Sequence, residues 1–474
     1  MLRQVIKLPI KGKTYQNVDE RELSTMSPYL INGRVDEAGV ASRSPGTLAW
    51  IDLGTSDPVD GLHWDDVFSC LWAISDGKLF KIVDTAGTNT DVSSGGVALG
   101  TNTRTNFANN GTHAVFANGG RMVYAANTGV TAYVGDADAP TTVTSVDFIN
   151  QYILCNETGT GQFHYSALND VTSWDALDFA TAETLPDVVN VLKVVNDEIL
   201  LGGPQSIEHW WNDGTTPFSR KDGGYISRGV LAPNSIIEAD NTVFFFDQDH
   251  KVTRLDVRTP KVISVPYDKT IGQLESGTSV IGNHLTVGGL SYYILHFPSD
   301  ARTFAYDYML DDWAEWASWN STTAVYEDFP CRTFAYCKDF GFWVAGSRTD
   351  GKIYKIGRDY HDLAGGVLRF ERRTGHVDHG TLGLKRSNSL ALTLNRGTGI
   401  SGSTVEPMLM VKYRDDNDPQ WSNEYHLSLG LMGNRTIRVD LKSLGMYYTR
   451  QWSFAVSSAV PVSLIDAEEH VDFL

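Results

Sequence analysis

The sequence has few cysteines, and their spacing is typical of neither a metal site nor a disulfide framework. Its 474 residues include four cysteines, Cys70, Cys155, Cys331 and Cys337, without a C-x-x-C pair. Free cysteine is among the residue types most often buried in protein cores. We therefore expect four buried, reduced thiols.

Long hydrophobic runs are also missing. The run VFFF at 243–246 is among the longest, whereas a membrane-spanning helix needs roughly 18 apolar residues. The first residues, MLRQVIKLPIKGK, contain neither the apolar stretch nor the small-residue cleavage site of a secretory signal. The sequence therefore predicts a protein without a membrane span that is made in the cytoplasm.

Basic residues are outnumbered by acidic ones. The chain has 39 Lys and Arg against 57 Asp and Glu, which gives a formal net charge of −18. A protein that holds nucleic acid through its phosphates needs a basic surface. If DNA is a partner, we expect it to pass by without sequence-specific binding.

The short motifs of several enzyme classes are absent. The sequence contains no Walker loop, no G-x-G-x-x-G after a strand, no G-x-S-x-G and no H-E-x-x-H. Some propeller glycosidases assemble their carboxylates from separate parts of the chain, so this absence alone does not exclude an enzyme. We assign no catalytic, cofactor-binding or metal-binding residue and predict a non-enzymatic protein without a cofactor.

What the chain does contain is a repeated hairpin. The octapeptide SDGKLFKI at 75–82 returns as TDGKIYKI at 349–356, and each copy follows a strand-like run, CLWAI and GFWVA. An apolar run, an Asp-Gly turn and then alternating polar and apolar side chains are typical of a β-hairpin.

Weaker copies of the same pattern lie between these two. The residues that follow each turn are Lys78, Val130, Gln162, Ser206, Lys251, Arg302 and Lys352, about 46 residues apart on average. Units of 40 to 50 residues with several short strands are typical of β-propeller blades. We predict seven blades; the short step from Val130 to Gln162 could reflect a misassigned turn, so six blades remain an alternative, as do several unrelated sandwiches.

Closure of such a ring makes its first and last blades neighbours. The two copies at 75–82 and 349–356 should therefore lie in adjacent blades. Their lysines Lys78, Lys81, Lys352 and Lys355 are then expected to be solvent-facing strand residues rather than a phosphate clamp.

The composition divides the chain into three parts. Residues 55–360 carry the repeat, and after 357 the sequence becomes rich in charge and histidine before strand-like runs resume. The 361–474 region is long enough for one β-sandwich-like domain. Residues 1–54 have only short strand-like runs and cannot bury a core alone, so we predict an N-terminal arm that packs on another domain or subunit. The predicted fold class is all-β.

Three local clusters have both a functional and a structural interpretation. In a strand, His376 and Asp378 would point away from His379, so we favour a surface loop over a metal site for 376–379. The acidic run 415–418 lacks the glycine and final glutamate of an EF-hand and is better interpreted as a polar turn. Tryptophans 313, 316 and 319 are expected to pack between blades rather than form a sugar platform.

The segment 200–273 contains a strand-like run before Ser206-Ile207-Glu208, then Pro217-Phe218 and Gly229. In these features it resembles the packaged-DNA stabilisation family of short-tailed bacteriophages, the tail hub or nozzle proteins. INGRVDEAGVASRSPGTLAW near the start and YYTRQWSFAVSSAVPVSLIDAEEHVDF at the end resemble it too. These motifs are structural and name no active site.

The resemblance implies a structural protein of the virion tail, assembled in the host cytoplasm. It implies a homohexameric ring below the portal and adaptor that extends the tail tube, retains packaged DNA, lets it pass during ejection and carries fibres or spikes. We expect the N-terminal arm and the sandwich to make the ring contacts. The alternative is a carbohydrate-active or carbohydrate-binding propeller, with carboxylates or tryptophans in its central pocket.

Overall fold

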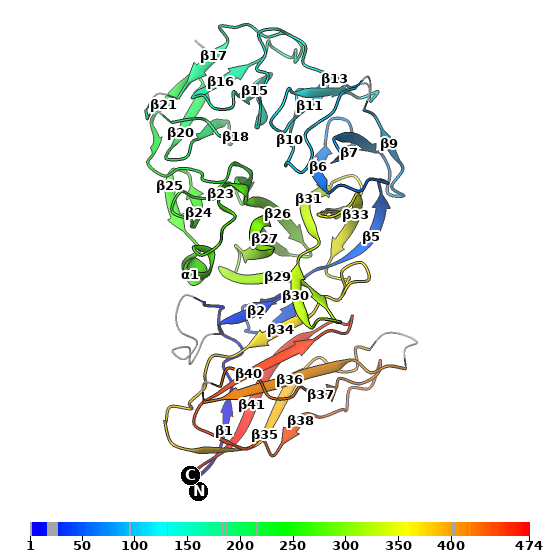
Figure 1. Cartoon of the computed structure of the whole chain (residues 1–474), viewed down its shortest axis with the longest axis vertical. Helices are drawn as coiled ribbons and strands as arrows, with labels where there is room; N and C mark the ends of the chain where they lie inside the picture. Colours follow the sequence, from blue (N-terminus) through cyan, green and yellow to red (C-terminus); the bar gives the residue numbers. More distant parts are fainter. Residues whose placement is uncertain are drawn as a thin grey trace.

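The chain folds into a ring of short sheets joined to a smaller sandwich of strands (Figure 1). The computed structural model describes residues 2–16, 27–93, 96–129, 131–182, 184–185, 187–214, 217–399, 404–416 and 418–474. Strands dominate these residues, as the all-β prediction required. The helical elements among the described residues are η2 (Pro233–Ser235), η3 (Val265–Tyr267), α1 (Asp268–Ile271), η4 (Gly277–Ser279) and η5 (Pro298–Asp300).

The ring consists of antiparallel four-stranded units, the blades of a β-propeller. Blades 1 to 3 are β6 (Val59–Asp65), β7 (Cys70–Ser75), β8 (Lys78–Ile82), β9 (Asn89–Asp91); β10 (Asn106–Asn109), β11 (His113–Ala117), β12 (Val123–Ala126), β13 (Thr131–Tyr133); and β14 (Val146–Ile149), β15 (Tyr152–Asn156), β16 (Gln162–Tyr165), β17 (Phe179–Thr181). Blades 4 and 5 are β18 (Val191–Val195), β19 (Glu198–Gly202), β20 (Ile207–Asn212), β21 (Phe218–Ile226); and β22 (Ile237–Ala239), β23 (Thr242–Phe246), β24 (Val252–Asp256), β25 (Thr259–Val262).

Two further units close the ring. Blade 6 is β26 (Ile281–Val287), β27 (Leu290–Phe297), β28 (Arg302–Asp307) and β29 (Asp312–Asn320), and blade 7 is β31 (Cys331–Cys337), β32 (Phe342–Ser347), β33 (Lys352–Gly357) and β5 (Gly46–Asp52). Strand β5 comes from the start of the chain and pairs with β33, with Ile51 opposite Ile353. The described residues thus form six separate four-stranded sheets and, in β26–β29, a seventh unit that continues into the sandwich.

The seven-blade prediction is therefore confirmed, although one turn used to derive it was misassigned. Val130 lies outside the described residues, and the hairpin around it joins β12 to β13, the third and fourth strands of blade 2. The other turns join second to third strands. The third strand of blade 2 begins at Val123. With Val123 in place of Val130, the third strands of the seven blades begin about 40 to 50 residues apart.

The two near-identical hairpins occupy equivalent places in adjacent blades, as predicted. One is β7–β8 in blade 1 and the other is β32–β33 in blade 7, and the first strands of these blades, β6 and β31, pack side by side. Lys78 and Lys352 are solvent-facing, whereas Lys81 and Lys355 are half-buried with their ammonium groups over aromatic rings.

Two sheets form the sandwich. The first has the order β3-β4-β41-β35-β38, with β1 also on β41 and β39 on β35; the second has the order β2-β34-β40-β36-β37. Their bounds are β1 (Leu2–Lys7), β2 (Tyr29–Ile31), β3 (Gly33–Val35), β4 (Ala41–Arg43), β34 (Phe370–Arg373), β35 (Lys385–Leu394), β36 (Met408–Asp415), β37 (Tyr425–Ser428), β38 (Val439–Lys442), β39 (Met446–Tyr447), β40 (Arg450–Val456) and β41 (Ser463–Phe473). Strands from the first 54 residues thus belong to both bodies, while the boundaries of the predicted domains stay a prediction.

One continuous ten-stranded sheet joins the propeller to the sandwich. Strand β29 of blade 6 pairs with β2, which pairs with β34, and β30 (Val325–Asp328) lies against β29. Asn32, fully buried after β2, fixes this joint: its Nδ2 donates to the carbonyls of Ala317 and Arg369 at 2.8 and 2.9 Å, and its Oδ1 accepts from the Ala317 amide at 2.9 Å. A buried polar group satisfied on every side holds the two bodies in one orientation.

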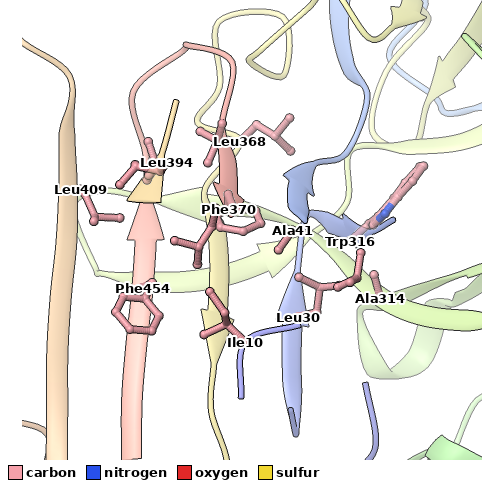
Figure 2. Packing of buried hydrophobic residues seen from close by; sticks show 14 of the residues in the cluster. Ile10, Leu30, Ala41, Ala314, Trp316, Leu368, Phe370, Leu394, Leu409 and Phe454 are labelled. Carbon is pink, nitrogen blue, oxygen red and sulfur yellow. The ribbon is translucent and has the colours of Figure 1, made fainter. Parts of the chain in front are cut away.

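The largest apolar cluster spans the same joint. Figure 2 shows Leu30 beside Trp316, with Phe370, Ile10 and Phe454 further along the same cluster. These residues come from three regions far apart in the chain, and all are buried. The N-terminal segment therefore completes the core of the sandwich instead of extending away from it.

The predictions for cysteines and two of the tryptophans are confirmed. All four thiols are free and buried. Trp313 packs with Tyr267 and Tyr306 in the cluster between blades 5 and 6, and Trp316 packs against Tyr292 and Phe329. Both indoles are 1% exposed and so form no platform for a sugar.

Candidate functional site

A pocket lies where the blades meet, at one end of the propeller axis, and we call it the channel mouth. It consists of two adjoining cavities of about 350 and 310 Å³ that share Thr103, Arg104 and Asn234. All seven blades contribute to it, from Pro58 ahead of β6 to Arg348 after β32. The lining residues come from the starts of the innermost strands and from the turns between second and third strands, which meet on one face of a propeller.

Asparagine side chains join neighbouring blades around this mouth. At the end of β15, Asn156 Oδ1 accepts from the amides of Thr144 and Ser145, and its Nδ2 donates to the Val189 carbonyl at 3.0 Å. After β11, Asn118 makes reciprocal hydrogen bonds with the backbone of Gly100. These bonds satisfy backbone groups that the sheets leave unpaired at their ends.

Three arginines converge on the channel mouth. Arg332 Nη1 lies 3.1 Å from Asp60 Oδ1, and Arg348 pairs with Asp328. Asp60 is fully buried beneath its arginine. Burial raises the pKa of Asp60 to about 6, and Arg332 opposes that rise.

Arg104 differs from the other two arginines because its partners are neutral. Its Nη1 donates to the Gly282 carbonyl and, at 2.9 Å, to Asn283 Oδ1. Within the described part of the chain no carboxylate lies within ion-pair distance of it. Burial lowers its pKa to about 10, and the positive charge of Arg332 contributes in the same direction. Arg104 remains charged at neutral pH.

A glycine allows blades 5 and 6 to approach closely beside Arg104. A Cβ added at Gly282 would lie 2.3 Å from the Ser235 carbonyl oxygen, nearer than any side chain tolerates. The backbone of β26 can therefore reach far enough into the mouth to accept the Arg104 hydrogen bond.

Two histidines near these arginines are neutral at physiological pH. Burial, followed by the charge of Arg104, lowers the pKa of His63 to about 3. Burial and the charges of Arg348 and Arg332 lower the pKa of His296 to about 3 as well. The positive charge of the channel mouth therefore comes from its arginines.

The other sequence clusters lie in the sandwich, away from this mouth. The segment 376–379 is a loop, as predicted, but the prediction that it lies at the surface was wrong: His376 is 7% exposed, and the His379 side chain contacts the Tyr447 hydroxyl at 2.9 Å and Glu469 at 3.2 Å. The residues pack there because Val377 pairs with Arg450. Among the described residues, no group of three or more His, Cys, Asp or Glu side chains is arranged to hold a metal ion.

The acidic run at 415–418 is part of a polar connection, as expected, with Asn417 outside the described residues. Asp415 ends β36 and binds the Arg450 guanidinium with both oxygens, at 2.6 and 2.7 Å. Asp416 accepts from the amides of Tyr448 and Thr449. Both carboxylates therefore already have partners within the chain.

Sequence reasoning did not find the arginines of the channel mouth. Asp60 and Arg332 are each the second residue of an innermost strand, β6 and β31, in neighbouring blades. An alignment of the blades at the starts of their innermost strands would have placed these two residues side by side. The predicted repeat was aligned on turns instead, and those turns lie one strand further along each blade.

The fold thus defines a seven-bladed β-propeller rigidly joined to a sandwich, with an arginine-bearing pocket at one end of the propeller axis. The family model described as "Bacteriophage P22 Gp10, beta-propeller" matches residues 36–361, well over half of the chain. The chain belongs to this family of phage structural proteins. No curated protein matches it. Within the described residues no helix is both long and apolar enough to cross a membrane.

Solved structures resemble it weakly. One is the computationally designed Ika8 protein, at 11% identity over 65% of this chain and 99% of that chain, with a TM-score of 0.41. Two are extracellular domains of two-component or one-component system proteins from B. thetaiotaomicron. Their identities are 11 and 10%, over 83 and 89% of this chain and 47 and 63% of theirs, both with a TM-score of 0.45.

Proposed function

We propose that this protein is the tail hub, or nozzle, subunit of a short-tailed phage virion. In this role a ring of six copies binds below the portal and adaptor, extends the tail tube and retains packaged DNA until ejection. The observation that carries the proposal is the family match over residues 36–361. The formal charge of −18 per chain favours a wall along which DNA slides, since few phosphate contacts would form.

The joint between the two bodies suits a load-bearing part of a tube. The ten-stranded sheet crosses it without a linker, and Asn32 and a shared apolar cluster fill it. A protein whose domains are fixed in this way transmits force without a hinge. We expect the ring to bind its neighbours through the sandwich and to present the propeller outward, where fibres or spikes could attach.

Exposed apolar side chains suggest where the ring contacts lie. Leu382, Met446 and Leu474 are 79, 60 and 50% exposed, and they surround one end of β35, where both chain termini lie (Figure 1). Apolar side chains grouped at one end of a protein are typical of contact surfaces. A ring needs such a surface on every copy.

Ring assembly tests the proposal directly. Light scattering after size exclusion, with and without the portal–adaptor complex of the same phage, should show a ring or docked species of several copies. The double change Leu382→Lys and Met446→Glu should abolish that species while the thermal transition of the monomer is unchanged. Val257→Lys, at an 83% exposed propeller position, is the matched control and should assemble normally.

DNA retention needs a second measurement. Particles assembled with the double variant should release nuclease-sensitive DNA, whereas particles with the Val257 control should keep it protected. A monomer that neither docks on the portal–adaptor complex nor affects DNA protection would contradict the proposal. Deleting the first 40 residues is a poor test, because Ile10 and Leu30 of the core would be lost with them.

A further inference from the structure

The channel mouth has unused capacity for hydrogen bonding. Only Nη1 of Arg104 donates to the described residues, so Nε and Nη2 remain for a ligand. Arg104 is partly exposed, and it lines both cavities. A guanidinium held by neutral acceptors in a partly buried site favours an oxyanion, which it binds through charge-assisted hydrogen bonds.

The rest of the lining carries no charge and mixes polar side chains with apolar ones, among them Ile281 and Leu231. Around the arginines stand asparagine, threonine and serine side chains, among them Asn102, Asn234, Thr278 and Ser279. Such groups both donate and accept, which suits the hydroxyls of a sugar. Among the residues that line the two cavities there is no Phe, Tyr or Trp on which a nucleobase could stack.

The size and the charge of the channel mouth limit further which ligands it can bind. Two adjoining cavities of about 350 and 310 Å³ accommodate one or two sugar units and not a nucleic-acid duplex. The two carboxylates behind the mouth, Asp60 and Asp328, each face an arginine of their own. Arg104 is left as the cation without a counter-ion within the described residues.

We propose that the channel mouth binds an acidic sugar, with the carboxylate or phosphate on Arg104 and the hydroxyls on the surrounding asparagine and threonine side chains. Such a ligand would give the propeller a binding function separate from ring assembly, which uses the sandwich. Ligand binding and assembly can therefore fail independently in experiments.

Titration calorimetry of the full-length protein with glucuronate, glucose 6-phosphate, glucose and inorganic phosphate tests the assignment. We expect both acidic sugars to bind and glucose to bind at least about tenfold more weakly, because it cannot form the charge-assisted bond. Comparison of glucuronate with glucose 6-phosphate then identifies the preferred acid. Equal affinity for inorganic phosphate and glucose 6-phosphate would overturn the sugar assignment.

Arg104→Gln is the decisive variant. It removes a cation that has no carboxylate partner among the described residues, so we expect an unchanged or higher thermal midpoint together with at least about tenfold weaker binding of the acidic sugars. Arg438→Gln, at an exposed position in the sandwich, should leave binding as in the wild type. No binding of either acidic sugar up to about 10 mM, or full binding by Arg104→Gln, would overturn the proposal.

Discussion

The propeller and the sandwich differ in how far along the chain their strands travel to pair. Each blade except the seventh is built from one continuous stretch of sequence, and only β5 comes from elsewhere. In the sandwich, β1, β3 and β4 from the first 43 residues join β35 and β41 from the last 90. The propeller repeats a local pattern, whereas the sandwich depends on contacts that no local pattern reveals.

The two bodies also differ in their buried charge. In the propeller, the buried pair Arg332–Asp60 and the partly buried pair Arg348–Asp328 lie at the channel mouth, and apolar clusters fill the space between blades. The sandwich and its joint bury Arg372, Arg450 and Glu469 completely among strands. Buried ions need several partners each, so the sandwich should tolerate the loss of one partner less well than the blades do.

Removing residues 2–52 should have the largest effect. The deletion takes away β1–β4 and also β5, which leaves β33 without its partner and the ring open. We expect no cooperatively folded protein, measured as the loss of a thermal unfolding transition in circular dichroism.

A circular permutant provides the control for that deletion. The termini are adjacent, because Leu2 pairs with Phe473, and the turn at Gly111 is exposed. A chain joined from Leu474 to Met1 and opened at Gly111 keeps every strand, so it should fold and unfold like the wild type. A folded deletion variant would mean that the N-terminal strands do not close the propeller.

Arg450→Met should produce the next largest effect. Arg450 binds both oxygens of Asp415, and its Nη1 lies 3.9 Å from the fully buried Glu469. Methionine would leave two carboxylates without their cation, which typically costs about 3–5 kcal/mol. Chemical denaturation measures the free energy of unfolding. Arg438→Met, at an exposed ion pair with Asp440, should change it by less than about 1 kcal/mol.

The sequence predicted the propeller better than the sandwich for a physical reason. The Asp-Gly hairpins at 75–82 and 349–356 are stabilised locally, so their pattern is visible in any window of eight residues. The place of His379 depends on Tyr447 and Glu469, more than 60 residues away. The charged stretch around 376–379 therefore resembled a surface loop, although the folded chain buries its histidines.

The channel mouth could be predicted from the sequence less well than the hairpins but better than the loop at 376–379. Its arginines lie in the repeat, but the two residues of an ion pair come from different blades, as with Arg332 and Asp60. Such a pair becomes visible only after the blades are aligned in the right register. The alignment on turns, with Val130 one strand out of place, could not show it.

Stability should depend on pH in opposite ways in the two bodies. Burial would raise the pKa of Glu371 at the joint, but Arg373 and the Tyr326 hydroxyl outweigh it and lower the pKa to about 2. Its stabilisation is therefore present above about pH 4.5 and is lost as the pH falls toward 2. The pKa of Asp60 is raised to about 6, so its contribution is present below about pH 4 and is lost as the pH rises through 6.

Unfolding free energies of Glu371→Gln and Asp60→Asn across pH 2–8 measure these contributions. Each carboxyl group should contribute about 3 kcal/mol to the free energy of unfolding across its pH range, because its pKa differs by roughly two units from that of the free side chain. Glu371→Gln should flatten the acid limb, and Asp60→Asn should remove the fall between pH 4 and 6. Identical pH curves for both variants would show that the two bodies do not differ in this way.

The smallest expected effect tests whether the twin hairpins are equivalent. Lys355 Nζ lies 4.1 Å from the centroid of the Phe342 ring, and Lys81 Nζ lies 5.6 Å from that of Trp72. Lys355→Met and Lys81→Met should each cost about 0.5–1 kcal/mol, because methionine keeps the apolar stem but loses the cation–π attraction. Lys352→Met, at an exposed lysine beside the half-buried Asp350, should leave the unfolding free energy unchanged. Unequal losses at the two ring-covered lysines would mean that blades 1 and 7 share a hairpin but not its energetics.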